Sequence, residues 1–242
     1  MENATLIALS RQVALGQQMD LVANNIANVD TPGFKADRML FAPVLEPVGN
    51  GVRAAFVHDF AVVPDMSDGE MEHTGNPLDL AIRGPGFFEV QTDQGVRYTR
   101  GGSFQLGPDG AIVTTDGDPV LADDGFPLFT LPGEGPITVS SDGVIGTVAG
   151  PIGRLGVVQF DQPERLEKVG NNLFTGDATP QPAEGAAVLQ GFIERANVEP
   201  VVEMTRMIAI LRSYQSAARL IDQQDQLRRR ALDVLGNVTR SA

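Results

Sequence analysis

The chain has 242 residues, a formal net charge of −13 at pH 7 and no cysteine. A chain of this length can bury a core in one or two domains, and its lack of cysteine excludes disulfides, a thiolate nucleophile and a cysteine metal site. Its acidic balance, without a basic and aromatic patch, argues against nucleic acid or an anionic membrane as a partner.

The ends of the chain differ from its middle in helix-breaking residues and in charge. All 16 prolines lie between Pro32 and Pro200. Residues 1–35 carry a net charge of −1 and residues 191–242 carry +2, so residues 36–190 carry −14. This distribution predicts a helix at each end and a β-rich body between them.

Neither end has the pattern of a membrane or secretion segment. The chain lacks any run of about 18 apolar residues, so we expect that it does not span a membrane. Glu2 and Asn3 stand where a cleavable secretory signal has its basic region. We therefore expect no cleaved signal peptide.

The first 35 residues show apolar side chains at steps of three and four, which predicts an amphipathic helix. One stripe comprises Leu15, Met19, Val22, Ile26 and Val29, and an adjoining stripe comprises Leu6, Leu9, Val13 and Ala23. Thr31-Pro32-Gly33 ends this helix, because proline disfavours helical geometry in the residue before it and glycine turns freely. Two stripes are too wide a face for one partner, so the helix needs other helices to cover it.

The middle of the chain divides into a connector and a strand-rich segment. Residues 36–75 are predicted to be an extended connector that contacts its neighbours, with a partly disordered linker as the alternative. Residues 76–190 contain short strand-like runs about ten residues apart, beginning with the alternating residues 78–82. Turns such as Pro108-Asp109-Gly110 separate them. This pattern predicts antiparallel sheets packed as a barrel or sandwich.

Residues 191–242 return to helical spacing. Asn197 is a candidate helix cap, and Pro200 suits a first helical turn. One apolar-rich stripe comprises Met207, Ile210, Tyr214, Ala217, Ile221, Gln224, Arg228, Ala231 and Leu235, and a second comprises Met204, Leu211, Ala218 and Leu232. A helix of about 40 residues is about 60 Å long, more than the first helix can cover. Identical neighbouring chains best explain the surplus.

The chain shows no pattern that indicates a catalytic, metal or cofactor site. Its histidines, His58 and His73, are not at metal-ligand spacing. Asp116-Gly117-Asp118 lacks the spacing of a calcium loop, and nothing separates Glu70 and Glu72 from ordinary solvated acids. We therefore expect no catalytic residue, no metal and no cofactor.

Three asparagines lie near the end of the first predicted helix. Asn24 and Asn28 are four residues apart and share a helix face, with Asn25 beside them. They are either polar surface residues beside a helix end, or a buried amide pair that fixes the register of packed helices. The residues alone leave both interpretations open.

Four blocks of sequence, in order, resemble the axial proteins of the bacterial flagellum, which are its rod, hook and hook-associated subunits. The first block is Ala23-Asn24-Asn25-Ile26-Ala27-Asn28-Val29-Asp30-Thr31-Pro32-Gly33-Phe34-Lys35, where the family more often has Asn-Thr-Thr or Ser-Thr-Thr at residues 30–32. The second runs over residues 75–88, 98–100 and 110–117, and the third over residues 155–158 and 170–174. The fourth comprises Ala196-Asn197-Val198, Glu203-Met204, Met207-Ile208, Arg212 and Tyr214. There the family more often has Ser at Ala196 and Gln at Leu211.

The resemblance implies an α+β fold. The helices of residues 1–35 and 191–242 would pair as a coiled-coil inner domain, and a mainly antiparallel β outer domain, residues 76–190, would be inserted between them. The resemblance also implies a structural subunit of the proximal rod, with a distal rod subunit as the alternative. Such a subunit polymerises through its terminal helices into the drive shaft that encloses the export channel.

The resemblance further implies partners and a location. The partners would be copies of the chain, other proximal and distal rod subunits, the flagellar type III export apparatus and the rings around the rod. The location would be the periplasmic rod of the basal body. The candidate assembly residues are Leu15, Met19, Val22, Asn24, Asn25, Ile26, Asn28, Val29, Asn197, Met204, Met207, Ile208, Leu211, Tyr214 and Ile221. A secreted β-rich enzyme acting on polysaccharide and a soluble binding module that dimerises remain as alternatives.

Overall fold

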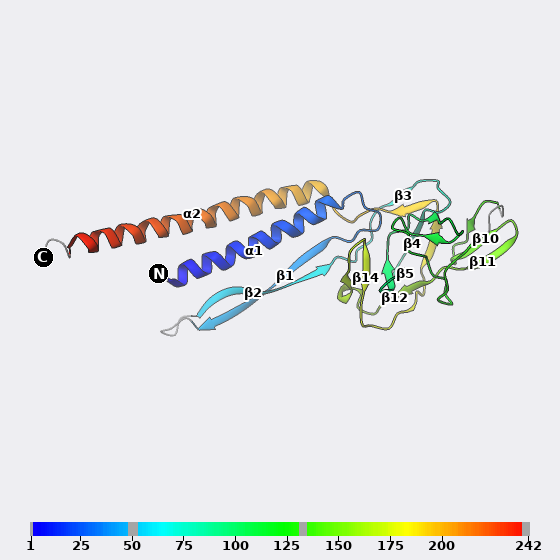
Figure 1. Cartoon of the computed structure of the whole chain (residues 1–242), viewed down its shortest axis with the longest axis horizontal. Helices are drawn as coiled ribbons and strands as arrows, with labels where there is room; N and C mark the ends of the chain where they lie inside the picture. Colours follow the sequence, from blue (N-terminus) through cyan, green and yellow to red (C-terminus); the bar gives the residue numbers. More distant parts are fainter. Residues whose placement is uncertain (1, 48–52, 131–134, 239–242) are drawn as a thin grey trace. The chain divides into compact units, whose positions relative to one another are not determined.

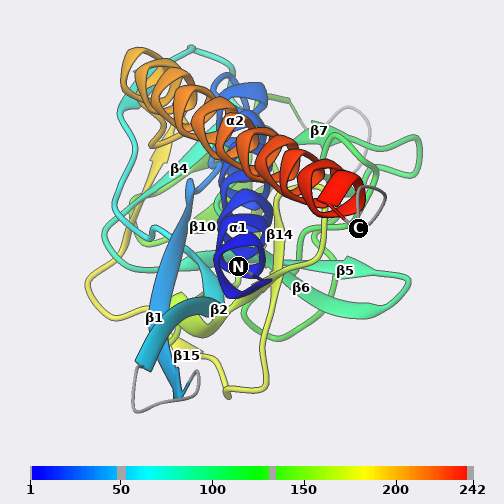
Figure 2. The same cartoon turned by 90° about the vertical axis from the view of Figure 1, so that its left-hand side faces the viewer.

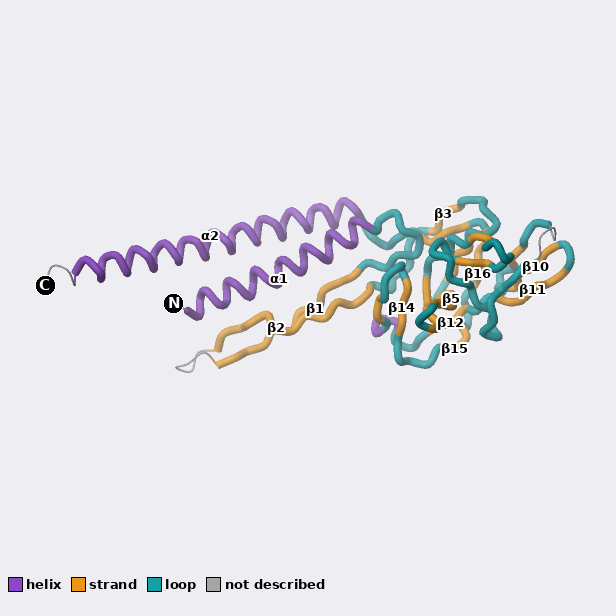
Figure 3. Tube along the Cα trace, viewed as in Figure 1, coloured by secondary structure: helices purple, strands orange, loops and turns teal. Residues whose placement is uncertain are grey.

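The structure is a computed structural model that describes residues 2–47, 53–130 and 135–238 and has an α+β fold (Figures 1 and 3). Its helices are α1 (Glu2–Ala27), the short 3₁₀ helix η1 (Pro163–Arg165) and α2 (Pro200–Val238). Its strands are β1 (Asp37–Pro47), β2 (Arg53–Pro64), β3 (Met71–His73), β4 (Leu80–Arg83), β5 (Phe87–Thr92), β6 (Gly95–Thr99), β7 (Gln105–Leu106), β8 (Ile112–Val113), β9 (Thr138–Val139), β10 (Val144–Thr147), β11 (Gly150–Arg154), β12 (Val157–Gln159), β13 (Glu167–Lys168), β14 (Leu173–Thr175), β15 (Gln181–Pro182), β16 (Ala187–Gln190) and β17 (Phe192–Glu194).

The chain forms two compact units. The first, called here the helical unit, contains α1 up to residue 26, residues 37–62, and α2 with residue 199 before it. The second, called here the β unit, contains residues 27–36 and 63–198. The helices predicted at the two ends are therefore confirmed, and neither helix is long and apolar enough to cross a membrane over the residues described.

In the helical unit, α1 and α2 run side by side in opposite directions, and the hairpin of β1 and β2 lies along the other side of α1 (Figures 1 and 2). Strand β1 contains Pro43 in its interior. A two-stranded sheet has a free edge on each strand, so a proline without an N–H is tolerated there.

The β unit packs around a six-stranded sheet of order β13-β14-β6-β5-β12-β15, and the strand pairings of the unit are antiparallel, as predicted. Successive side chains of a strand point to opposite faces. Phe88 of β5 therefore lies in the larger apolar cluster, whereas Phe87 lies in a smaller cluster with Tyr98, Phe160 and Phe174. Both faces of the sheet are covered.

The alternating residues 78–82 were predicted to contain a strand, and β4 occupies residues 80–83. In β4, Leu80, Ala81 and Ile82 are all buried. Leu80 and Ile82 belong to the larger cluster, and Ala81 lies on the opposite face of the strand, which is also covered.

Glu89 of β5 provides a test of this packing through pH. Burial raises the pKa of its carboxyl above the usual value, so folding favours the protonated form. The stability that this group contributes is present at low pH and is lost as the pH rises through the folded-state pKa. We expect Glu89→Gln to be more stable than the parent chain at pH 7. We expect the two chains to be equally stable at about pH 3, where the Glu89 carboxyl is protonated in both the folded and the unfolded state. Urea unfolding at both pH values measures this. A variant that is less stable at pH 7 would contradict it.

Candidate assembly site

The chain leaves α1 at Ala27 and turns into the β unit within a few residues. The N–H of Thr31 donates to the carbonyl of Asn28 over 3.1 Å, and the Thr31 hydroxyl donates to the Asn28 side-chain oxygen over 3.3 Å. The N–H of Phe34 then donates to the Thr31 carbonyl. The predicted stop signal is thus a hydrogen-bonded turn that follows the end of the helix.

Gly33 is held in a position that no other residue fits. Its φ of 69° lies in the left-handed region, which L side chains rarely adopt. A Cβ atom at Gly33 would also lie 2.2 Å from the carbonyl carbon of Arg100. Its own N–H donates to the carbonyl of Glu194 over 2.6 Å. The turn therefore brings the end of the motif directly onto the backbone of the β unit.

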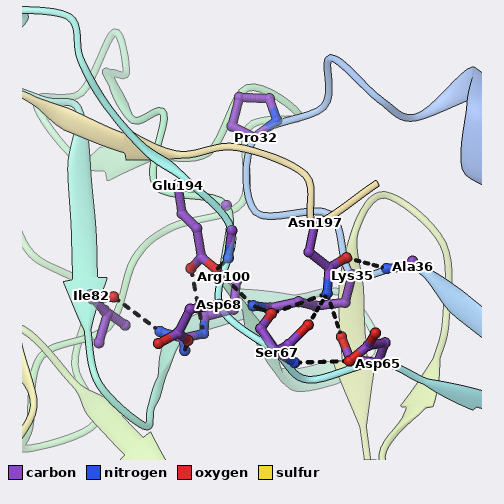
Figure 4. Close-up of polar contacts among 12 residues, drawn as sticks. Pro32, Lys35, Ala36, Asp65, Ser67, Asp68, Ile82, Arg100, Glu194 and Asn197 are labelled. Carbon is purple, nitrogen blue, oxygen red and sulfur yellow. Dashed lines mark hydrogen bonds and ion pairs between the residues drawn. The ribbon is translucent and has the colours of Figure 1, made fainter. Parts of the chain in front are cut away.

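Lys35, the last residue of the motif, is buried with Glu194 (Figure 4). The Lys35 ammonium lies 2.6 Å from Oε1 of Glu194, and both side chains are 1% exposed. The ammonium also donates to the carbonyl of Ser67 over 2.7 Å, and the N–H of Gly69 donates to the same Glu194 oxygen over 2.8 Å. Burial lowers the pKa of Lys35 below its usual value, and the Glu194 carboxylate partly offsets that effect.

Arg100 supplies a second buried cation at the same place. Its Nε lies 3.6 Å from Oε2 of Glu194, and its other nitrogens donate to the carbonyls of Ile82 and Gly84 and to the carboxylate of Asp68. Lys35, Arg100, Glu194 and Asp68 are called the clamp below. Its two cations and two carboxylates balance in charge, which buried ions require.

Asn197, predicted as a helix cap, instead fastens the backbone around the clamp. Its side-chain oxygen accepts the N–H of Ala36 over 2.7 Å, and its amide donates to the carbonyls of Asp65 and Ser67 over 2.8 and 3.0 Å. Its own N–H donates to the carbonyl of Phe34. Helix α2 begins at Pro200, as predicted, but this asparagine is not its cap.

A loop of the β unit closes over the same turn. The amide of Asn172 donates to the carbonyl of Pro32 over 2.9 Å. The ammonium of Lys168 donates to the carbonyl of Lys35 and lies 4.2 Å from the centre of the Phe34 ring. Residues 27–36 are thus held in the β unit by contacts from four separate parts of the chain, which are Ser67, Arg100, residues 168–172 and residues 194–197.

The buried amide of the asparagine group is Asn25, in the helical unit. Its side chain accepts the N–H of Asp37 over 2.9 Å and donates to the carbonyl of the same residue over 3.0 Å. Asn24 is exposed and Asn28 is half-buried. Within one chain Asn28 acts in the turn after α1, and a role for Asn24 and Asn28 between packed helices stays a prediction.

The other candidate residues among the first 35 positions divide between the two units. In the helical unit, Val22 is buried and Leu15, Met19 and Ile26 are half-buried. Val29 belongs to the β unit, where it packs against a small apolar cluster formed by Phe34, Ala36 and Val198.

On α2, the candidate residues divide into a covered and an uncovered side. Met207, Tyr214 and Ile221 are half-buried. Met204, Ile208 and Leu211 are 53%, 53% and 43% exposed, and their spacing of four and three places them on one face. This row is called the α2 stripe below. Exposed apolar side chains in a row indicate an interaction surface.

Sequence patterns did not reveal the clamp. Lys35 and Arg100 appeared only as the last residues of blocks that resemble the axial proteins, and Glu194 and Asp68 were not selected. A buried ion pair between residues 159 positions apart has no periodicity that a sequence pattern could reveal. Among the described residues, no group of three or more acidic or histidine side chains could bind a metal.

Comparison with known proteins decides which family this chain belongs to. Flagellar basal-body rod protein FlgF of Caulobacter vibrioides is 41% identical to it over 98% of this chain and 100% of that protein. The chain belongs to the flagellar basal-body rod protein family. FlgF of Mesorhizobium japonicum is 32% identical to this rod protein over 98% of the chain and 99% of that protein. FlgG of Bacillus subtilis is 32% identical over 87% of this chain and 90% of that protein.

Three family profiles match separate parts of the rod protein. They are described as flagella basal body rod protein, residues 6–35, flagellar hook protein FlgE/F/G D1 domain, residues 81–158, and flagellar basal body rod FlgEFG protein C-terminal, residues 189–234. Lys35, Arg100 and Glu194 lie one in each matched segment, so the clamp joins all three. The resemblance to axial proteins and the role of a structural rod subunit are confirmed.

The clamp predicts that Lys35→Met destabilises the β unit of this rod protein by about 3–5 kcal/mol, because it leaves a buried carboxylate without its nearest cation. Adding Glu194→Gln should recover part of that loss, since no unpaired charge then remains. Lys168→Met, which removes the other lysine of the chain, should cost about 1 kcal/mol. Urea unfolding followed by the near-UV circular dichroism of Tyr98, in a Tyr214→Phe background, measures all three. A loss under about 1 kcal/mol for Lys35→Met would contradict the clamp.

The turn at Gly33 predicts a large effect of one methyl group. Gly33→Ala should destabilise the β unit by more than about 3 kcal/mol, because both the backbone angle and the space exclude a Cβ. Gly125→Ala is the matched control: its φ of 82° is also left-handed, but no atom lies within 4 Å of its Cβ position. It should cost only about 1–2 kcal/mol. Equal effects of the two changes in thermal unfolding would show that the close contact at Gly33 is unimportant.

Proposed function

We propose that this chain is a subunit of the proximal rod that polymerises through α1 and α2. The observation that carries the proposal is the α2 stripe, Met204, Ile208 and Leu211, which stays exposed in the single chain. A large exposed apolar row is unfavourable in a monomer, so another subunit must cover it. The two helices would form the coiled-coil inner domain, with the β unit as the outer domain between them in sequence.

The charge distribution supports this arrangement. Residues 36–190 carry −14 of the net charge, whereas the two terminal segments are nearly neutral. Near-neutral helices can crowd around an axis without strong repulsion between copies, and an acidic segment there could not. The helices would therefore surround the export channel and transmit torque, and the acidic segment would face outward.

A position in the proximal rather than the distal rod is supported by the length of the alignments. The FlgF relatives align over 98% of this chain and 99–100% of their own length. The FlgG relative of Bacillus subtilis leaves 13% of this chain unaligned. A distal position is the alternative, and the localisation experiment below separates the two.

The remaining parts of the proposal concern partners and activity. The chain would be exported unfolded by the flagellar type III apparatus and would join proximal and distal rod subunits in the periplasm, close to the surrounding rings. It would have no enzymatic activity. The match to a family of structural rod proteins supports this.

The α2 stripe gives a direct test of polymerisation. We expect Ile208→Asp to leave the fold of the monomer unchanged, because the side chain is exposed, and to abolish incorporation into rods by placing a charge in an apolar contact. Ala209→Asp is the matched control, since Ala209 is exposed on another side of the same helical turn. Motility and the amount of chain in purified basal bodies report the result. Normal incorporation of Ile208→Asp would remove the stripe from the interface.

Localisation tests the position along the rod. An epitope inserted in the exposed turn at residues 123–125 should label detergent-extracted basal bodies near the inner-membrane end of the rod. Label nearer the hook would move the chain to the distal rod. An absence of label, with the chain found elsewhere in the cell, would contradict the proposed function.

A further inference from the structure

A groove lies between α1 and α2 within the helical unit. Its volume is about 550 Å³. It is lined by Ala8 and Arg11 of α1 and by Arg212, Ser213, Ser216, Ala217 and Leu220 of α2. Apart from the two arginines and one leucine, these side chains are small, so the backbone of another helix can approach closely.

The serines of the groove do not make it polar. The Ser213 hydroxyl donates to the carbonyl of Ala209 over 3.0 Å, and the Ser216 hydroxyl donates to the carbonyl of Arg212 over 2.8 Å. Each hydroxyl proton is therefore used within α2 itself. The wall formed by α2 presents small side chains with their donors satisfied, together with the half-exposed Leu220, and it suits an apolar occupant.

The two arginines of the groove favour an occupant that has an acidic side chain. Arg11 and Arg212 are both exposed, and neither makes an ion pair or a side-chain hydrogen bond within the described part of the chain. Two cations beside an apolar wall are complementary to a surface that is apolar with one carboxylate. The α2 stripe has no exposed acid between its three apolar residues, so it matches this groove poorly.

The outer face of α1 has the required composition. Leu9 and Val13 are 51% and 55% exposed, and Gly16 and Asp20 continue the same row at steps of three and four. Asp20 is exposed and has no ion pair among the described residues. The row therefore combines two apolar side chains, a glycine that permits close approach, and a single carboxylate.

The spacing of the row matches the spacing of the groove. Val13 and Asp20 are seven residues apart, which is about 10 Å along a helix. Arg212 and Leu220 are eight residues apart, or about 12 Å. If a second α1 runs antiparallel to α2, Val13 lies beside Leu220 when Asp20 lies beside Arg212. That direction is also the direction of the first chain's own α1 (Figure 1), as expected for copies related by rotation about a common axis.

We infer that the groove between α1 and α2 receives the outer face of α1 from a second copy of this chain. Val13 of that copy lies in the groove against Leu220, its Leu9 continues the contact beyond Leu220, and its Asp20 pairs with Arg212. The inference rests on the proposed function, because it names the contact through which copies join. The two surfaces are different, so the interface is heterologous and leaves one groove and one α1 face free to continue the assembly.

Charge reversal tests the ion pair. Arg212→Glu and Asp20→Arg should each lower incorporation into basal bodies by about tenfold, which corresponds to about 1.4 kcal/mol, and the double variant should restore it. Arg212→Lys keeps the charge and should retain most incorporation. Arg212→Glu combined with Asp222→Arg has the same net charge as the restored variant but the wrong acid, and it should remain defective. Rescue by this last combination would overturn the inference.

Co-expression separates contacts between copies from contacts within one chain. A mixture of Arg212→Glu chains and Asp20→Arg chains can alternate, so that every groove meets an α1 of suitable charge. We expect the mixture to incorporate better than either variant alone. A rescue that occurs only when both changes are in one chain would place the pair within the chain and overturn the inference.

A disulfide tests the contact directly, because the chain has no cysteine of its own. In Val13→Cys/Leu220→Cys, oxidation of basal bodies should join copies of the chain into dimers and larger products, because the proposed register places these two residues side by side. Val13→Cys/Asp222→Cys is the control and should not, because Asp222 is exposed on the opposite side of the same helical turn. Incorporation without this crosslink would overturn the inference while leaving the rod function intact. A parent chain that is itself absent from basal bodies would instead contradict the proposed function.

Discussion

The buried pair of Lys35 and Glu194 is the interaction on which the packing of residues 27–36 within the β unit depends. A charge that is 1% exposed requires a partner, because desolvation costs several kcal/mol for each ion. The two partners come from opposite ends of the chain, one shortly after α1 and the other shortly before α2. Removing Glu194 leaves the Lys35 ammonium without a carboxylate partner, and removing Lys35 leaves Glu194 with only the more distant Arg100. The backbone N–H groups around the pair follow the same requirement, because the N–H of Ala36 donates to Asn197 and the N–H of Gly69 donates to Glu194.

The features of the fold that the sequence predicted are those with a repeating local pattern of residues. Steps of three and four residues predicted both helices, and glycine and proline spacing predicted the antiparallel strands, because each is a local pattern. Non-local features could not be read in this way. Ala81 is buried because both sides of its strand are covered, and Lys35 meets Glu194 across 159 positions. Neither feature produces a periodic pattern of residues in the sequence. The resemblance to a family indicated the function, whereas the clamp could be identified only from the structure.

The motif of residues 23–35 serves two units with two kinds of contact. Its first part holds Asn25, whose amide pairs with the backbone of Asp37 inside the helical unit. Its last part holds Gly33 and Lys35, which contact Arg100 and Glu194 inside the β unit. Apart from the close approach of Gly33 to Arg100, these contacts are directional hydrogen bonds or ion pairs. The motif therefore helps to determine the conformation of one chain, and its part in assembly stays a prediction.

The proposed assembly would use residues of the opposite kind, which are exposed and apolar. Met204, Ile208 and Leu211 on α2 and Leu9 and Val13 on α1 are exposed and apolar, and they make few demands on the fold of the single chain. Contacts of this kind are non-directional and scale with the area removed from water, so they tolerate the small differences in position that neighbours along a rod present. Direction must then come from a few polar groups, as it does at interfaces where charged pairs set the register. In α1 and α2, Asp20, Arg11 and Arg212 have no ion pair among the described residues and can supply it. In the proposed assembly, polar contacts would define the monomer, apolar rows would supply most of the contact area between copies, and these charges would select which surfaces meet.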